Sequence, residues 1–332
     1  MNSFGRIYKF SSFGESHGAA IGGVIEGLPA GISINLDEIQ KNLNLRRPGL
    51  LENTSERQEP DKLTVLSGLY QGKTLGTPIG FTIANEDCKS SDYEFLKDVF
   101  RPSHADFTNF SKYGIRDHRG GGRSSAREMA IRIVAGSVAQ QILKTLNVQI
   151  VAFVSQIGHA ICPVSEIKDQ QEVYNSPVYC PFRDSENEMV ELLEYIKLSG
   201  DSVGGRLTCI CYGVPIGLGE PVYDKLSARL AQSMFSINGV KGFEIGSGFQ
   251  CISKKGSEHN DSFCFTDNKI HTITNNSGGI QGGISNGETI NMNIAFKPTS
   301  SIALPQKTVN SDFKNVEINI SGRHDPCIAI RA

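Results

Sequence analysis

The feature that most constrains the fold is an apolar stripe that follows Ser125. Ser125 and Glu128 have the spacing of a capping box, in which two side chains satisfy N–H groups at the start of a helix. Beyond them, small and apolar side chains recur at i, i+3, i+4 and i+7 through Ile142, the spacing of one helix face. Because these residues are small and apolar, we expect this helix to pack in the interior of the protein.

Weaker signals predict the other elements. A second capping-box pattern, from Asn35 to Glu38, predicts a helix that continues through Leu43. Amphipathic patterns predict further helices at 188–198 and 224–235. Strand-like runs, rich in β-branched or alternating residues, lie at 149–154, 206–211, 290–296 and 316–320. Strands and helices do not alternate regularly, so we expect an α+β fold, built as one domain over residues 1–332.

The composition excludes several classes of protein. A net charge of −2 over 332 residues gives no overall field that favours nucleic acid or an anionic membrane. The N-terminus lacks the apolar core of a signal peptide, and no apolar run approaches the roughly 18 residues of a membrane span. The eight cysteines form no C-x-x-C pair and no zinc spacing. We therefore expect a cytoplasmic protein with reduced thiols, no metal, and no nucleic-acid or membrane partner.

The strongest candidate for chemistry is the segment HRGGGRSSAR at 118–127. Its glycines free the backbone to expose N–H groups, and the predicted helix N-terminus behind them attracts an anion. Arg119, Arg123 and Arg127 add forked donors suited to phosphate and carboxylate. Between residues 101 and 132 the local charge is +4. The alternatives are a surface loop before a solvated helix and an RNA-binding RGG segment, although RGG segments are repeated and disordered.

Histidines and an aspartate in three other segments are candidates for proton transfer. His17, in FGESHG at 13–18, lies among small residues that leave it accessible, and histidine titrates near physiological pH. His104 follows a proline turn in FRPSHAD, and Asp325 lies in the polar string GRHDPC. Each of these residues could equally serve as a structural residue of a turn. The G-x-S-x-G spacing of a nucleophilic serine is absent.

Two more segments could hold an anion. Arg46 and Arg47 follow a predicted helix in RRPG at 46–49, and KPTSS at 297–301 is a hydroxyl-rich turn after a predicted strand. Both could also be solvated surface. Taken together, the arginines and glycine-opened backbone suit anions, and the histidines and aspartate suit protons. Without clustered metal ligands or an activated thiol, they favour an elimination or transfer on a small phosphorylated substrate.

Ten strings, in order along nearly the whole chain, resemble the signatures of the chorismate synthase family. They are FGESHG (13–18), RRPG (46–49), EPD (59–61), FRPSHAD (100–106), DHRGGGRSSARE (117–128), GVPIGLGEPV (213–222), SINGVKGFEIG (236–246), GGIQGGIS (278–285), KPTSS (297–301) and GRHDPC (322–327). Ten ordered motifs make a chance similarity implausible. The resemblance implies a sandwich with helices packed between β-sheets, and a homotetramer.

The resemblance also implies a reaction. In this family 5-enolpyruvylshikimate 3-phosphate loses phosphate and a ring proton in a 1,4-anti elimination that gives chorismate, the last common step toward aromatic compounds. Reduced FMN is required although there is no net redox change. Because the chain has no dinucleotide fingerprint, we expect an external reductant, with NADPH as an indirect source of electrons.

Position by position, the resemblance implies roles for individual residues. The catalytic set is His17, which protonates the departing phosphate, His104, which lies near the reduced flavin, and Asp325, which receives the ring proton. The substrate-binding set is Ser16, Arg46, Arg127 and Arg323, and Arg46 is also the position for a contact with NADP. The flavin-binding set is Arg123, Ser124, Ser125, Asn238, Gly239, Gly282, Lys297, Pro298, Thr299, Ser300, Ser301 and Arg323.

The sequence departs from the family pattern at a few positions. Glu52 and Gln58 stand where the family has basic residues, and Gly239 replaces a common alanine. The family continues with a helix beyond the point at which this sequence stops, so we expect that a tail is missing. Two other classes stay open at this point. The glycine–serine loop could serve an ATP-dependent kinase, and the basic 101–132 region could bind RNA.

Overall fold

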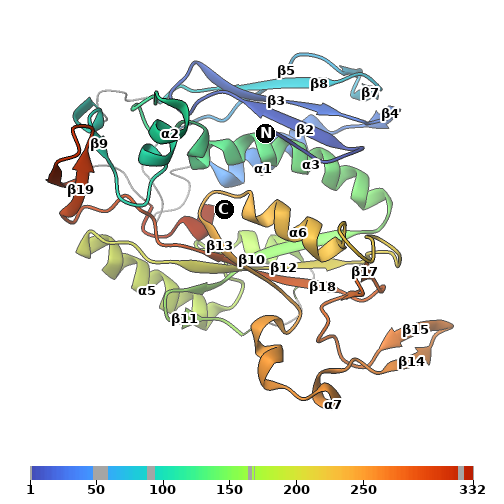
Figure 1. The fold of residues 1–332 in the computed structure, drawn as a ribbon. Helices are drawn as coiled ribbons and strands as arrows, with labels where there is room; N and C mark the ends of the chain where they lie inside the picture. Colours follow the sequence, from blue (N-terminus) through green and yellow to red (C-terminus); the bar gives the residue numbers. More distant parts are fainter. Residues whose placement is uncertain are drawn as a thin grey trace.

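The computed structural model describes residues 2–47, 59–87, 94–163, 167, 169–320 and 325–331. Two five-stranded antiparallel sheets dominate it (Figure 1). The first sheet contains, in spatial order, β1 (Ser3–Phe4), β2 (Lys9–Phe13), β3 (Ala20–Glu26), β8 (Ile79–Ala84) and β5 (Leu63–Val65). The second contains β11 (Ala160–Ile161), β10 (Gln149–Ile157), β12 (Gly205–Tyr212), β18 (Ile290–Phe296) and β13 (Val240–Ile245).

Three helices lie between the two sheets (Figure 1). They are α1 (Leu36–Arg46), α3 (Met129–Thr145) and α6 (Leu226–Phe235). A fourth, α5 (Arg183–Ser199), covers the outer face of the second sheet and begins five residues before the predicted position. The predicted α+β sandwich, with helices between antiparallel sheets, is therefore confirmed.

The interior position of α3 explains its apolar stripe. Ile131 and Val134 of α3 are buried against Ile25 and Phe81 of the first sheet. Gly23 of β3 makes this close approach possible, because a Cβ placed there would lie 2.9 Å from the Ile131 side chain. A larger residue at this position would push α3 off the sheet and lose part of the about 1.5–3 kcal/mol that burial of each large apolar side chain contributes.

The start of α1 shows why its predicted capping box is only half correct. Asn35 does cap the helix, because its Oδ1 accepts from the N–H groups of residues 37 and 38 at 3.0 and 3.1 Å. Glu38, however, pairs with Lys144 of α3. The backbone N–H of Asn35 donates instead to Oε1 of Gln141, at 2.8 Å. The Glu38 carboxylate and the Asn35 N–H would pair with each other in a complete capping box, but here they connect α1 to α3.

Smaller elements complete the fold. Two three-stranded sheets are β20 (Asn315–Ile318), β19 (Gln306–Asn310) and β9 (Val99–Phe100), and β4 (Ala30–Ser33), β7 (Lys73–Leu75) and β6 (Leu69–Tyr70). The short helices are α2 (Asp106–Tyr113), α4 (Gln170–Tyr174) and α7 (Gly256–His259). Two hairpins are β14 (Phe263–Thr266) with β15 (Lys269–Thr272), and β16 (Ile280–Gln281) with β17 (Ile284–Ser285). The first hairpin and α7 form an arm that projects from the second sheet (Figure 1).

The described residues lack two further features. Within these ranges, no helix combines the length and apolar character needed to cross a membrane. The same ranges contain no group of three or more histidine, cysteine, aspartate or glutamate side chains placed to hold a metal ion.

Candidate active site

One cavity, with a volume of ≈ 930 Å³, collects nine of the residues predicted from the sequence. Its walls come from the end of β2, the loop before α2, the 115–126 loop, the turn before β13 and the loop after β18. The predicted residues among its lining are His104, Arg123, Ser124, Asn238, Gly239, Lys297, Pro298, Thr299 and Ser300. The fold therefore joins in one wall the motifs that the sequence separates.

Glycines let the 118–125 loop approach the turn that carries His17. Gly120 has a φ of +100°, and a Cβ placed on it would lie 2.5 Å from Nδ1 and Cε1 of the His17 ring. Gly122 has a φ of +51°, and a Cβ placed on it would lie 2.6 Å from Oε2 of Glu15. Because real Cβ contacts are longer than this, a side chain at Gly120 would displace the His17 ring, whereas at Gly122 the flexible Glu15 side chain could move aside.

The α-helix behind this loop begins later than the sequence predicts. Gly122–Ser124 and Ala126–Glu128 are 3-10 helices, and α3 starts only at Met129. Ser125 caps the second of them, because its Oγ accepts from the N–H of Arg127 at 3.3 Å. The expected α-helix N-terminus directly after the glycines is therefore wrong. The positive charge of the loop comes from its arginine side chains.

Glu128 orients Arg123 in the cavity wall. Nη1 of Arg123 donates to Oε2 of Glu128 at 2.6 Å, and Nη2 donates to Oγ of Ser12 at 2.6 Å. Ser12 in turn donates to Oε1 of Glu128 at 2.6 Å. Glu128 is thus occupied and does not close the predicted capping box. The guanidinium of Arg123 is fixed at the cavity edge with its charge balanced by one carboxylate.

Ser16 and His17 lie on the turn between β2 and β3, next to the cavity wall at Gly120. Oγ of Ser16, a buried residue, is 3.1 Å from Nδ1 of His17. The turn is closed by Asn85, whose Nδ2 donates to the carbonyl oxygens of Glu15 and Gly18 at 3.0 and 2.9 Å. Asn85 belongs to none of the motifs found in the sequence. Its only signal is its place just after β8, the strand that pairs with β3.

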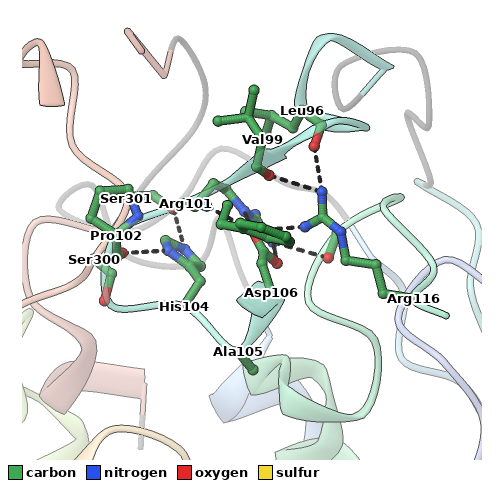
Figure 2. A network of polar contacts seen from close by, with 12 residues as sticks. Leu96, Val99, Arg101, Pro102, His104, Ala105, Asp106, Arg116, Ser300 and Ser301 are labelled. Carbon is green, nitrogen blue, oxygen red and sulfur yellow. Dashed lines mark hydrogen bonds and ion pairs between the residues drawn. The ribbon is translucent and has the colours of Figure 1, made fainter. Parts of the chain in front are cut away.

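Both ring nitrogens of His104 are held (Figure 2). Nδ1 lies 3.0 Å from the carbonyl oxygen of Pro102, and Nε2 lies 2.9 Å from Oγ of Ser301. A carbonyl oxygen only accepts, so Nδ1 carries the hydrogen and Nε2 accepts from the serine hydroxyl. Burial, and next the Arg101 guanidinium, lower the pKa of His104 to about 4. The ring is therefore neutral at neutral pH.

A buried ion-pair cluster supports the loop that carries His104 (Figure 2). Nε and Nη2 of Arg101 each donate to a carboxylate oxygen of Asp106 at 2.8 Å, and Nη1 of Arg116 lies 3.0 Å from the same carboxylate. Burial alone would raise the pKa of Asp106, but the hydrogen bonds from Arg101 hold it below its ordinary value. Arg101 also donates to the carbonyl oxygen of Gly120 at 3.1 Å. Arg101 and Asp106 belong to the FRPSHAD string, whereas Arg116 belongs to none of the motifs found in the sequence.

Arg46 and Arg127 do not line the large cavity. Both are buried beside Asp61, which is 0% exposed. Nη1 of Arg127 hydrogen-bonds to the Asp61 carboxylate, and Nη1 of Arg46 lies 3.7 Å from it. Arg127 Nε also donates to Oδ1 of Asn85 at 2.9 Å. Asp61 belongs to the EPD string, for which the sequence indicated no role.

Arg46 has two hydrogen-bond donors that the described residues do not use. Its Nε and Nη1 have no hydrogen-bond partner among the described residues, and burial lowers its pKa to about 9. It lines a second cavity of ≈ 410 Å³ together with Arg331. Arg331 pairs through Nη1 with the buried carboxylate of Asp325 at 2.6 Å. Asp325 therefore lies beside Arg331 at the second cavity, and neither it nor Arg46 lines the large one. Arg323 lies outside the described residues.

The loop after β18 can accept a phosphorylated cofactor. Oγ1 of Thr299 is buried without a hydrogen-bond partner among the described residues, and such a hydroxyl costs about 1–3 kcal/mol unless something satisfies it. Lys297 adds an ammonium group that donates to the Ser103 carbonyl at 3.0 Å and to Ser300 Oγ. An unsatisfied hydroxyl beside a cation fits the phosphate end of FMN.

Other predicted flavin-binding residues differ in their placement. Asn238 joins the wall by donating from Nδ2 to the Ser124 carbonyl at 2.7 Å. Gly239 has a φ of +90°, and its carbonyl oxygen accepts from the backbone of Lys297 at 3.0 Å. Ser125 and Gly282 are not among the residues that line the cavity. Gly282 lies in the turn between β16 and β17.

The whole chain resembles known proteins. A profile of chorismate synthases matches residues 8–332. The chorismate synthase of Azobacteroides pseudotrichonymphae is 52% identical over 334 residues, which cover 100% of this chain and 94% of that protein. The one from Christiangramia forsetii is 53% identical over 333 residues, 100% and 92% of the two chains. A crystal structure of chorismate synthase matches with a TM-score of 0.74 and 31% identity, over 89% of this chain and 85% of that one.

Full-length relatives at about half identity and a shared architecture agree with the motifs gathered at the large cavity. The chain belongs to the chorismate synthase family.

Proposed function

We propose that the cavity between His104, Arg123 and Thr299 is the site at which this chain performs the chorismate synthase reaction. In that reaction the C–O bond to the phosphate of 5-enolpyruvylshikimate 3-phosphate and a ring C–H bond both break, and a conjugated double bond forms. The observation that carries the proposal is the continuous wall made by the 118–125 loop, the 101–106 loop and the 297–301 loop. Its charged and hydroxyl groups match an anionic substrate and cofactor.

Reduced FMN, when bound, supplies electron density to the substrate while phosphate leaves. The residues proposed to hold FMN are those of the cavity wall, with the Thr299 hydroxyl and the Lys297 ammonium toward its phosphate. The His104 ring lines the same cavity and is neutral, so it would add no positive charge next to the bound cofactor. NADPH is proposed only as an indirect source of electrons for the cofactor.

His17 is proposed as the general acid that protonates the departing phosphate. Its support is the position of the ring between Ser16 and the glycine loop. A ring packed against backbone has little freedom to turn, and proton transfer requires a fixed approach of about 2.6–3.2 Å between heavy atoms. Ser16, whose hydroxyl faces Nδ1 of His17, is proposed to hydrogen-bond the substrate.

Asp325 is proposed to take the ring proton, and the arginines to hold the anionic groups. Arg331 orients the Asp325 carboxylate at 2.6 Å. Two guanidinium nitrogens of Arg46 lack hydrogen-bond partners among the described residues, so Arg46 can bind a carboxylate or the phosphate without breaking a hydrogen bond through these atoms. Arg127 and Arg323 stay predictions as further substrate ligands, and so does the NADP contact at Arg46.

The decisive experiment is an anaerobic assay of phosphate release. Purified protein is mixed with 5-enolpyruvylshikimate 3-phosphate in the presence and absence of reduced FMN, and phosphate and chorismate are measured together. We expect equal amounts of the two products, and only with reduced FMN. Absence of both products in the reduced sample would overturn the proposed function.

Assembly and location are proposed as well. The projecting arm exposes Phe263, Phe265 and Ile270, and the 3-10 helix before it (Gly248–Ser253) exposes Phe249 and Ile252. Such surface normally lies in an interface. We propose that it contributes to a homotetramer, which the molar mass in light scattering would test. The seven described cysteines are free, which supports a reducing, cytoplasmic location. A single domain over residues 1–332 stays a prediction.

A further inference from the structure

The turn that carries His17 is held mainly from outside itself. One backbone hydrogen bond closes it internally, from the N–H of Gly18 to the carbonyl oxygen of Glu15 at 3.0 Å, and Oγ of Ser16 lies 3.1 Å from Nδ1 of His17. The Glu15 and Gly18 carbonyl oxygens both also accept from Nδ2 of Asn85, at 3.0 and 2.9 Å. The backbone N–H of Asn85 donates to the carbonyl oxygen of Ala19 at 3.1 Å. A single residue therefore fixes three carbonyl groups around His17.

The other side of the Asn85 amide faces Arg127. Its Oδ1 accepts from Nε of Arg127 at 2.9 Å, and Arg127 is buried on the Asp61 carboxylate. Two carbonyl oxygens need donors and Nε needs an acceptor, so the amide can have only this orientation. Nδ2 uses both hydrogens on the His17 turn, while Oδ1 faces the guanidinium.

We propose that Asn85 is a positioning residue that holds the His17 turn in register with Arg127, so that the proton donor and the charged groups of the site keep one relative geometry. The role rests on the proposed function, in which His17 protonates the leaving phosphate. A displacement of about 1 Å in such a donor lowers the rate by about 100-fold. In this proposal Asn85 does not contact the substrate or the transferred proton, and it acts through the position of the turn.

The variant Asn85→Asp tests this positioning role. The carboxylate has the same shape and still accepts from Arg127, but it cannot donate to the Glu15 and Gly18 carbonyl oxygens and repels them. We expect kcat to fall about 10- to 100-fold, with KM changed by less than about 3-fold, because the donor is misplaced while substrate binding is kept. Asn85→Ala, which removes both contacts, should lower kcat in the same way and serves if the charged variant folds poorly.

Asn275→Asp is a matched control. Asn275 is also half-buried and also closes a turn: Nδ2 donates to the carbonyl oxygen of Thr289 at 2.7 Å, and Oδ1 accepts from Gly279 at 2.8 Å. It lies beyond the arm, and neither it nor its partners line the large cavity. The same chemical change there should leave kcat within about 2-fold of the wild type.

Hydrogen–deuterium exchange gives a reading that does not depend on turnover. In both Asn85 variants, exchange should rise at least about 10-fold in residues 14–19 and stay unchanged in residues 275–286, and Asn275→Asp should show the reverse. If the wild type releases no phosphate, the proposed function fails, while exchange still decides whether Asn85 holds the turn. If the wild type is active, any one of three results overturns the inference. They are an unchanged kcat in the Asn85 variants, unchanged exchange in residues 14–19, and an equal loss of kcat in Asn275→Asp.

Discussion

Gly120 and His17 are in such close contact that a Cβ on Gly120 would lie 2.5 Å from two atoms of the imidazole ring. This contact joins the glycine–arginine loop to the turn between β2 and β3, two segments that lie more than 100 residues apart in the chain. The backbone of the loop thus forms one side of the slot that holds the ring. Gly120 is therefore required by its packing against His17 as well as by any anion that the loop binds.

Gly120→Ala should therefore displace His17. We expect at least about a 10-fold loss of turnover and a stability loss of about 1–3 kcal/mol, from the clash together with the strain of a φ of +100°. Gly217→Ala separates the two effects, because Gly217 also has a φ of +100° but has nothing within 4 Å of its Cβ position. Urea denaturation and the anaerobic assay measure both. Equal activity in the two variants would contradict a role for the contact.

Removal of the His17 side chain should affect the reaction more than the fold. His17→Ala is expected to lower kcat by about 100- to 10,000-fold, the range for a lost general acid, and to leave the melting temperature nearly unchanged because the ring is only half-buried. His159→Ala changes an exposed histidine on the second sheet and should keep full activity. A fully active His17→Ala protein would remove His17 from the mechanism.

The unpartnered Thr299 hydroxyl gives a prediction about FMN that does not require turnover. Thr299→Val should weaken FMN binding about 10-fold, while the stability of the FMN-free protein stays equal or rises by about 1 kcal/mol, because no hydrogen bond is lost. Flavin fluorescence titration measures the affinity. Thr272→Val also removes a buried, unpartnered hydroxyl, but on the projecting arm. It should leave FMN affinity unchanged, and equal weakening in both variants would speak against Thr299 as a ligand.

The Arg101–Asp106–Arg116 cluster should matter greatly for stability. Asp106→Asn leaves two buried guanidinium groups without a carboxylate, so unfolding free energy should fall by about 3–5 kcal/mol. The same change at Asp117, which pairs with Arg119 at the surface with 32% and 48% of the two side chains exposed, should change it by less than about 1 kcal/mol. Denaturant titration compares the variants, and similar losses would mean that the buried cluster is not a support.

The buried imidazole of His104 predicts a pH dependence of stability. Its pKa is about 4 in the folded protein, against an ordinary value of 6.5. Between these values the unfolded chain binds a proton that the folded protein does not, so stability falls as the pH decreases from 6.5 to 4. At about 1.36 kcal/mol per pKa unit, the loss is at most about 3 kcal/mol. The stability difference between wild type and His104→Asn should shrink over this range, and a constant difference would argue against a buried neutral ring.

Helix periodicity depends on local burial, so the residues alone predicted an interior helix in an α+β fold, whereas the sandwich was implied by the family resemblance. The stripe from Ala126 to Ile142 needs no knowledge of its partners to indicate an interior helix, and α3 lies there. The start of α3 was predicted wrongly because the carboxylate of Glu128 binds Arg123 and Ser12 across the fold. Glu128 can form this contact in place of the capping hydrogen bond only after folding has brought Ser12 close to it.

The sequence predicted which residues belong to the site, but not the hydrogen bonds and ion pairs that connect them. Family motifs indicated His104 and the 297–301 loop, and both line one wall. Asn85 and Asp61 carried no interpretable signal because their contacts are nonlocal: Arg127 is 42 residues from Asn85 and 66 from Asp61. The polar groups that support a site are chosen by tertiary geometry, which a single sequence does not display.

The hydrogen bond between His104 and Ser301 spans 197 residues, and that between Asn238 and Ser124 spans 114. Closing loops of this length is entropically unfavourable and slow, so such contacts form late in folding. Helices and hairpins can therefore be complete in a refolding chain that has no cavity wall. During refolding, flavin binding should return after the circular dichroism signal, which makes the closing of the cavity the last step in the maturation of the enzyme.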